Sequence, residues 1–319
     1  MQRRFLDYLI ISFKGLAMGA ADAVPGVSGG TIAFISGIYE ELIDTISNVN
    51  ASLFKTLISK GFKAFWVQLN GNFILALLLG IVVSYVSFMR IAKYLIEFHP
   101  ILIWSFFFGL IVASLLFVGK QITKWSATTV ISLILGTIAA YYISTLPSSA
   151  ENDNPLFLFF AGAIAICAMI LPGISGSFIL VVLGAYKTLS DAIHDFDLKK
   201  LAAFILGALV GLLSFSRILK WLFKHYHNVT LALLTGFILG SLNKVWPWKK
   251  VLSWRTNSKG EEIPFLEESI SPFSFDGEHQ LGEAILLMVL GFLTIILLEK
   301  FGAKTKNITI NAKHKNPYR

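Results

Sequence analysis

The chain of 319 residues contains the same apolar segment twice, and this duplication constrains its fold more than any other feature. Residues 25–31 (PGVSGGT) match residues 172–178 (PGISGSF) at an offset of 172 − 25 = 147. A second block, residues 80–114, matches residues 207–241 at an offset of 207 − 80 = 127. A chain with this pattern consists of two related structural units. The two repeats meet at the acidic link 148–155 and are assigned to residues 1–150 and 151–319.

Long apolar stretches follow each copy of the short motif. Hydrophobic residues make up 55% of the chain and charged residues 14%, whereas soluble domains carry about 25% charged residues. We therefore predict an all-α integral membrane protein of the cytoplasmic membrane with six full spans. The predicted spans are residues 71–95, 100–118 and 126–146 in the first repeat, and 200–222, 228–243 and 281–300 in the second.

The composition excludes several classes of protein. A soluble enzyme or nucleic-acid-binding domain does not fit, although the net charge is +8, because basic residues in short loops set membrane topology and meet anionic headgroups. No nucleic-acid partner is expected. The single cysteine, Cys167, excludes a disulfide framework and a multi-thiolate metal site. No metal or cofactor is predicted.

The two glycine-rich segments are predicted to interrupt helices within the membrane. The Pro-Gly-x-Ser-Gly sequence breaks a helix, and the arms on either side of each break are too short to cross a bilayer. Broken backbone at this depth is tolerated where it is enclosed by protein or lines a cavity. We interpret residues 5–47 and 155–193 as re-entrant helical hairpins.

Charge asymmetry predicts the topology. The tail 302–319 and the segment 52–66 are basic, whereas the link 148–155 carries only Glu151 and Asp153. Since basic loops stay in the cytoplasm, both termini are expected there and the link outside. The two repeats then have opposite orientation, which makes an inverted repeat. If each hairpin were instead a broken span, the repeats would be parallel, which suits the basic tail less well.

The long segment 244–280 is expected to be an extracytoplasmic loop under this topology. Its tryptophans, Trp246, Trp248 and Trp254, are expected in the aromatic belt at the membrane interface.

An anion site is predicted at the hairpin tips. Inverted repeats with interrupted helices are typical of secondary transporters, which bind substrate where the halves meet. Free backbone N–H groups after each break favour negative charge, glycines allow close approach, and hydroxyl groups add donors. The alternative is that the glycines only allow tight helix packing. The candidate residues are Gly26, Ser28, Gly29, Gly30 and Thr31 at the first tip, and Gly173, Ser175, Gly176 and Ser177 at the second.

Arg90 and Arg217 are the second group of candidate ligands. Each lies on a predicted helix face that also carries small residues, so each is expected to point into the protein. An arginine lining a cavity binds phosphate through two parallel hydrogen bonds. Anchoring of a helix end is the alternative role.

Asp22 breaks the symmetry between the repeats, because 22 + 147 = 169 and residue 169 is a methionine. An acid three residues before the break is a candidate carrier of a coupling proton or sodium ion. Capping of the backbone or pairing with an arginine remains an alternative.

The motif resembles a known family. Residues 18–31 (MGAADAVPGVSGGT) and their second copy, residues 171–177 (LPGISGS), are similar to the PopT family, and the likeness covers nearly the whole chain. Membership implies translocation of undecaprenyl phosphate, the carrier lipid of cell-wall synthesis, from the outer to the inner leaflet. The implied partners are this lipid and the surrounding membrane lipids. The second copy departs from the first, with Ser177 and Phe178 in place of Gly30 and Thr31.

Two other function classes remain. A membrane undecaprenyl pyrophosphate phosphatase has a similar Pro-Gly-x-Ser segment, but an arginine follows where Gly29 and Gly176 stand here. Without this arginine, charge stabilisation for pyrophosphate cleavage is lost, so no enzymatic activity is expected. A transporter of a small soluble anion fits the physical argument as well as a lipid translocase. The coupling ion, lipid selectivity, transport direction and oligomeric state are not determined by the sequence.

Overall fold

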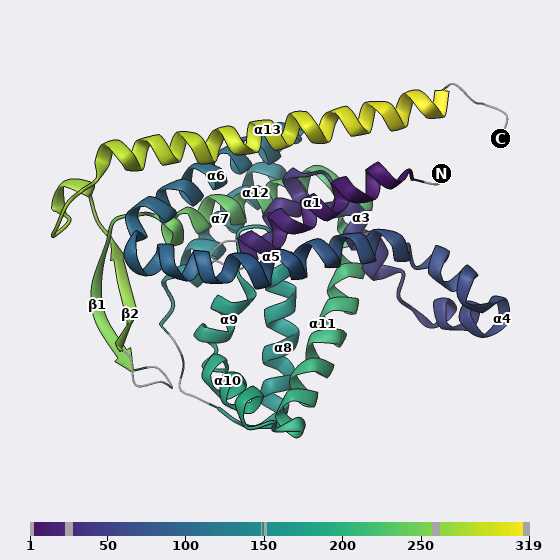
Figure 1. Cartoon of the computed structure of the whole chain (residues 1–319), viewed down its shortest axis with the longest axis horizontal. Helices are drawn as coiled ribbons and strands as arrows, with labels where there is room; N and C mark the ends of the chain where they lie inside the picture. Colours follow the sequence, from purple (N-terminus) through teal and green to yellow (C-terminus); the bar gives the residue numbers. More distant parts are fainter. Residues whose placement is uncertain (1–2, 23–27, 148, 150–151, 257–261, 315–319) are drawn as a thin grey trace.

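The computed structural model describes residues 3–22, 28–147, 149, 152–256 and 262–314 (Figure 1). The first repeat contains α1 (Phe5–Asp22), α2 (Gly29–Ile35), α3 (Tyr39–Ser47), α4 (Ala51–Gln68), α5 (Gly71–Phe98), α6 (Pro100–Lys120) and α7 (Ala127–Thr145). The second contains α8 (Pro155–Ile170), α9 (Gly176–Val182), α10 (Tyr186–His194), α11 (Leu198–His225), α12 (His227–Ser241), the 3-10 turn η1 (Leu242–Val245) and α13 (Leu281–His314).

Membrane-spanning helices dominate the structure. In the described residues, five segments are long and apolar enough to cross a bilayer: Gly71–Phe88, Pro100–Lys120, Ala127–Thr145, Leu198–His225 and His227–Val245. The bent pair α9 and α10, which turns by 104°, makes a sixth if it counts as one span. The apolar part of α13, Leu281–Leu297, is shorter. The protein is therefore a multi-pass helical membrane protein.

Polar residues at the membrane ends start several of these helices. The side chain of Asn154 accepts a hydrogen bond from the Leu156 amide at the start of α8, where Pro155 occupies the first helical position. Asp197 accepts from two amides at the start of α11. These caps satisfy amide groups that have no partner within the helix.

The helices pack in pairs that follow the repeat. α1 packs against α5, and its equivalent α8 packs against α11. The other two pairs join the halves, because α6 packs against α13 and its equivalent α12 packs against α7. Neither half is thus a separate bundle.

Glycines explain how closely these pairs approach. In each pair, both helices carry a glycine at which an added Cβ would collide with a carbonyl oxygen of the partner helix. Small residues at such crossings let helix backbones come together in membranes. The four pairs of glycines are Gly15 and Gly80, Gly162 and Gly207, Gly109 and Gly291, and Gly136 and Gly236.

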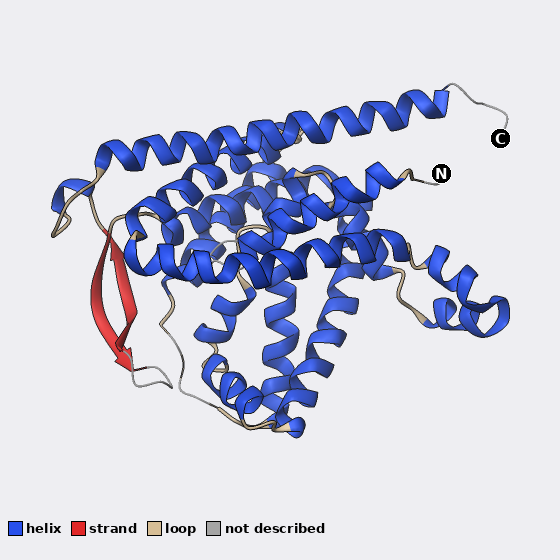
Figure 2. Cartoon of the chain, viewed as in Figure 1, coloured by secondary structure: helices blue, strands red, loops and turns tan. Residues whose placement is uncertain are grey.

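The segment 244–280 departs from the predicted all-α fold. It contains an antiparallel hairpin of β1 (Lys249–Thr256) and β2 (Glu262–Ser269), followed by the short turn η2 (Pro272–Ser274) (Figure 2). Trp248 is only 1% exposed, and its indole N–H donates to the His279 carbonyl at 3.0 Å. Trp246 likewise donates to the Ile270 carbonyl. The expected place of Trp248 in a lipid-facing belt is wrong, because the folded segment itself supplies its partner.

The basic segment 52–66 forms most of α4, which projects from the bundle in Figure 1. Gly61 bends this helix, with a φ of 79° that favours glycine. Phe54, Ile58 and Phe62 are exposed alongside the lysines.

Candidate functional site

The two hairpin tips, which lie far apart in the sequence, are in direct contact. The hydroxyl of Ser28 donates to the Leu171 carbonyl at 3.2 Å, and the Gly173 amide donates to Thr31 Oγ1 at 2.9 Å. Each bond joins one repeat to the other. The structure therefore brings the described residues of both motif copies to one place, at the start of α2 and between α8 and α9.

Close backbone contact explains several of the predicted glycines. An added Cβ at Gly30 would lie 2.6 Å from the Ile170 carbonyl oxygen, in the opposite repeat. Gly173 has a φ of 85° and packs against the backbone of α12, so a side chain would be both strained and obstructed there. Gly176 packs in the same way against the Ala165 carbonyl of α8. Tight packing is thus a demonstrated role of these residues.

Asp22 interacts with the backbone of the first tip. Its Oδ1 accepts a hydrogen bond from the Gly29 amide at 2.7 Å, at the start of α2. Among the roles considered for Asp22, backbone capping is the one seen here. The amide that was expected to face an anion is already paired with the protein's own carboxylate.

The two tips differ in accessibility. Ser28 and Thr31 are each 2% exposed, and every residue of α2 is buried. At the second tip, Ser177 is exposed and its hydroxyl lies 2.9 Å from that of Ser175. The hydroxyl groups that a ligand can reach are therefore those of the second tip.

Arg217 contacts a different part of the protein. Its guanidinium donates to the Val49 carbonyl at 2.9 Å, just after α3, and the neighbouring Lys220 pairs with Asp44 at 3.2 Å. These contacts tie α11 to the end of α3, and no described contact joins Arg217 to a tip residue. Gly26 and the side chain of Arg90 lie outside the described residues.

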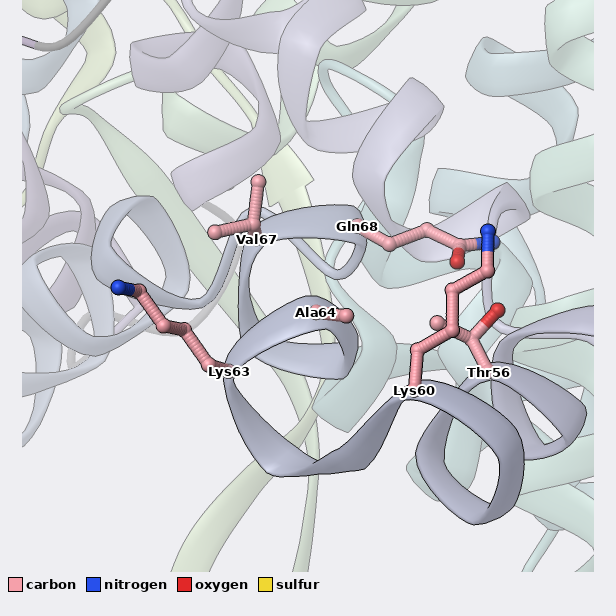
Figure 3. Close-up of a pocket in the computed structure, with 6 residues that line it drawn as sticks. All are labelled: Thr56, Lys60, Lys63, Ala64, Val67 and Gln68. Carbon is pink, nitrogen blue, oxygen red and sulfur yellow. The ribbon is translucent and has the colours of Figure 1, made fainter.

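One hollow lies in the bend of α4 and is lined by residues of this helix alone (Figure 3). Figure 3 shows Lys60 beside Gln68, while Lys63 points away on the opposite side. Because the two ammonium groups do not converge, this hollow is not an anion site.

A smaller hollow lies beside the second tip. Ser144 of α7, Ser241 of α12 and Lys244 of η1 line it together with the tip residues Gly173, Ser175 and Phe178. Lys244 was not a sequence candidate, because it was assigned to an extracytoplasmic loop. A signal was present, however: Lys244 lies three residues after the end of the second repeat block, and its counterpart, 244 − 127 = 117, is a phenylalanine.

Comparison with known proteins identifies the family. A family model described as undecaprenyl phosphate translocase-like matches residues 18–263, which include both tips and Lys244. The chain belongs to this family. The resemblance inferred from the motif is therefore confirmed.

Two curated relatives of this chain carry the name polyprenyl-phosphate transporter. One, from Vibrio cholerae serotype O1, is 45% identical over 308 residues, which cover 95% of this chain and all of the relative. The other, from Staphylococcus aureus, is 34% identical over 232 residues, covering 67% of this chain and 77% of the relative. No solved structure matches the chain.

The described residues offer no site for a metal ion, because they include no group of three or more His, Cys, Asp or Glu side chains that could hold one. The chemistry available at the tips is hydrogen bonding and charge.

The contact between the tips leads to a first prediction. Thr31→Val keeps the shape of the side chain but leaves the partly buried Gly173 amide without an acceptor, so we expect the free energy of unfolding to fall by about 1–3 kcal/mol. Thr31→Ser retains the oxygen and is expected to lose much less. Thermal unfolding of the purified protein in detergent measures both.

Thr294→Val provides a matched control, because the Thr294 hydroxyl bonds only the Leu290 carbonyl of its own helix. Equal stability of the Thr31 valine and serine variants would show that the inter-tip bond is unimportant.

Proposed function

We propose that this protein moves undecaprenyl phosphate, or a related polyprenyl phosphate carrier lipid, from the outer to the inner leaflet for reuse in cell-envelope synthesis. The observation that carries the proposal is the direct contact between two broken helices from the two repeats, in a chain whose relatives are named polyprenyl-phosphate transporters. Secondary transporters bind substrate at such a junction. The proposed activity is transport and not catalysis.

The headgroup is the difficult part of this substrate. A phosphate loses its hydration in the membrane, which is expensive unless hydrogen bonds and positive charge replace the water. Serine hydroxyls and backbone amides at the tips supply donors, and Arg90 and Arg217 remain proposed ligands that supply charge. The prenyl chain is as apolar as the bilayer, so it stays in lipid while only the headgroup crosses.

Alternating access fits the inter-tip bonds. A hydrogen bond between neutral groups stabilises the folded state by only about 0.5–1.5 kcal/mol net. Where water or the headgroup replaces the lost partner, Ser28 and Leu171, and Gly173 and Thr31, can therefore separate and rejoin during a cycle at small cost. Rocking of one repeat against the other, with these bonds broken, would admit the headgroup between the tips.

The proposed inverted repeat is supported by the helix pairing. Each half packs a helix against the other half: α6 packs against α13, and its equivalent α12 packs against α7. This pairing is expected for two units related by a pseudo-two-fold axis. In Figure 1, the start of α1, the end of α13 and the basic α4 lie towards one side, and the β-hairpin lies towards the other. We assign the first side to the cytoplasm.

Transport in vesicles tests the proposed function. Purified protein reconstituted into liposomes is expected to move a fluorescent polyprenyl phosphate between leaflets, measured by accessibility of the probe to an impermeant quencher. A soluble phosphate monoester trapped in the vesicles is expected to stay inside. Release of the ester without movement of the lipid would instead identify a small-anion transporter, the alternative function.

Topology is tested by labelling single cysteines in a Cys167→Ala background. Asp153 and Lys55 are both exposed, in the link and in α4 respectively. We expect an impermeant thiol reagent to label the Asp153→Cys variant in intact cells and the Lys55→Cys variant only after permeabilisation. The reverse pattern would overturn the assigned orientation.

Ion coupling is proposed to depend on Asp22. A permanent negative charge beside the first tip repels a phosphate, so neutralisation by a proton or a sodium ion would link headgroup binding to an ion gradient. Asp22→Asn keeps an oxygen that can accept from the Gly29 amide. We expect this variant to fold and to bind the carrier lipid, but to lose the response of transport to imposed pH or sodium gradients.

Asp22→Ala separates coupling from capping. It removes the acceptor as well as the charge and is expected to lower stability by about 1 kcal/mol. An asparagine variant with a full gradient response would exclude Asp22 from coupling.

A further inference from the structure

Lys244 is the cation that lines the hollow beside the second tip. Its side chain is 29% exposed, and its ammonium nitrogen lies 4.9 Å from the centre of the Phe178 ring. A cation over an aromatic face is attracted by the partial negative charge that the ring quadrupole places on that face. Phe178 replaces the threonine of the first copy, so this departure from the repeat places an aromatic surface under a positive charge.

In the described part of the chain, Glu267 is the only acid in contact with Lys244, and the distance between the two charged groups is long. The Lys244 nitrogen lies 3.8 Å from Glu267 Oε2, which is beyond hydrogen-bond distance. The same carboxylate oxygen lies 3.5 Å from Lys249. Two ammonium groups therefore share one carboxylate, which leaves an excess of positive charge beside the tip.

Lys249 contacts the backbone of Lys244 and is largely enclosed by protein. It is 12% exposed, its ammonium donates to the Lys244 carbonyl at 2.8 Å, and it lies 4.8 Å from the centre of the Trp104 ring. Burial lowers the pKa of Lys249 to about 8, although Glu267 opposes this shift. Lys249 is thus enclosed by the base of the β-hairpin, whereas Lys244 faces the hollow.

We propose that Lys244 and the Ser175 hydroxyl bind the phosphate monoester headgroup at the second tip, and that Glu267 pairs with Lys244 in the absence of substrate. This inference rests on the proposed function and adds a ligand to it. A headgroup carrying more than one negative charge competes well for Lys244, because Glu267 holds it at 3.8 Å and keeps Lys249 as a partner when Lys244 leaves.

The size of the hollow indicates how the exchange occurs. Its volume is about 20 Å³, enough for one water-sized group and too small for a whole phosphate. Movement of Lys244 away from Glu267, or separation of the tips, is required for the headgroup to enter. Binding is therefore coupled to the same opening that the transport cycle needs.

Opposite effects of two substitutions test the proposal. Binding of a short-chain polyprenyl phosphate to the purified protein is measured in detergent, with the matching prenyl alcohol as a control without the headgroup. Lys244→Met is expected to weaken phosphate binding about tenfold or more, because it removes a charged hydrogen bond. Lys244→Arg should stay within a few-fold of the original affinity. Glu267→Gln should strengthen binding severalfold, because it removes the competing charge.

Lys250→Met is the matched control, since Lys250 is an exposed lysine of the nearby strand β1 and its loss changes the net charge equally. A purely structural ion pair predicts that Lys244→Met and Glu267→Gln both lower thermal stability and leave affinity unchanged, which would overturn the inference. If Glu267→Gln does not fold, the contrast between the methionine and arginine variants of Lys244 decides the matter alone.

Failure of the inference is distinguishable from failure of the proposed function. If the unmodified protein binds the lipid phosphate and Lys244→Met binds it equally well, Lys244 is not a ligand but the function stands. If the unmodified protein binds inorganic phosphate as well as the lipid phosphate, the lipid assignment itself is wrong. Binding of the lipid but not of inorganic phosphate, lost in Lys244→Met, supports both.

Discussion

A broken helix inside a membrane leaves backbone N–H and C=O groups that water cannot reach, and each unpaired group costs several kcal/mol. Both motifs of this protein lie within apolar segments, and the described polar groups beside the helix ends there pair with one another. The Gly173 amide donates a hydrogen bond to Thr31, the Ser28 hydroxyl donates to the Leu171 carbonyl, and the Gly29 amide donates to Asp22. The rest of the structure follows from this requirement, because the two repeats have to meet at their tips for either break to be stable.

The helix pairs hold the tips in contact without fixing them rigidly. Reciprocal glycines bring α1 against α5 and α8 against α11, so the helix that leads to each tip packs on one long helix of its own repeat. The pairs α6 with α13 and α7 with α12 connect the repeats. Backbone packing of this kind resists separation of helices, whereas each described bond between the tips is a single hydrogen bond between neutral groups. Motion is thus expected at the tips and not within the pairs.

Asymmetry between the repeats gives the two tips different tasks. The first tip is buried, and its serine and threonine are committed to the second repeat. The second tip keeps accessible hydroxyls, with Phe178 and Lys244 beside them. The first tip thus maintains the junction, and the second offers polar groups to a ligand. Equal roles for the tips, which the repeat alone suggests, do not fit these contacts.

The sequence by itself determined the membrane class, the duplication, the helix breaks and the family, because each depends on local composition or on a motif that is contiguous in the chain. Only the tertiary structure decided which donors are already paired. Asp22 caps Gly29, and Arg217 binds the Val49 carbonyl, because partners distant in sequence come together only on folding. The same holds for Trp248 and Lys244. Both were assigned to a loop, and both have their surroundings set by the folded segment 244–280, which packs against the first turns of α6 and α13.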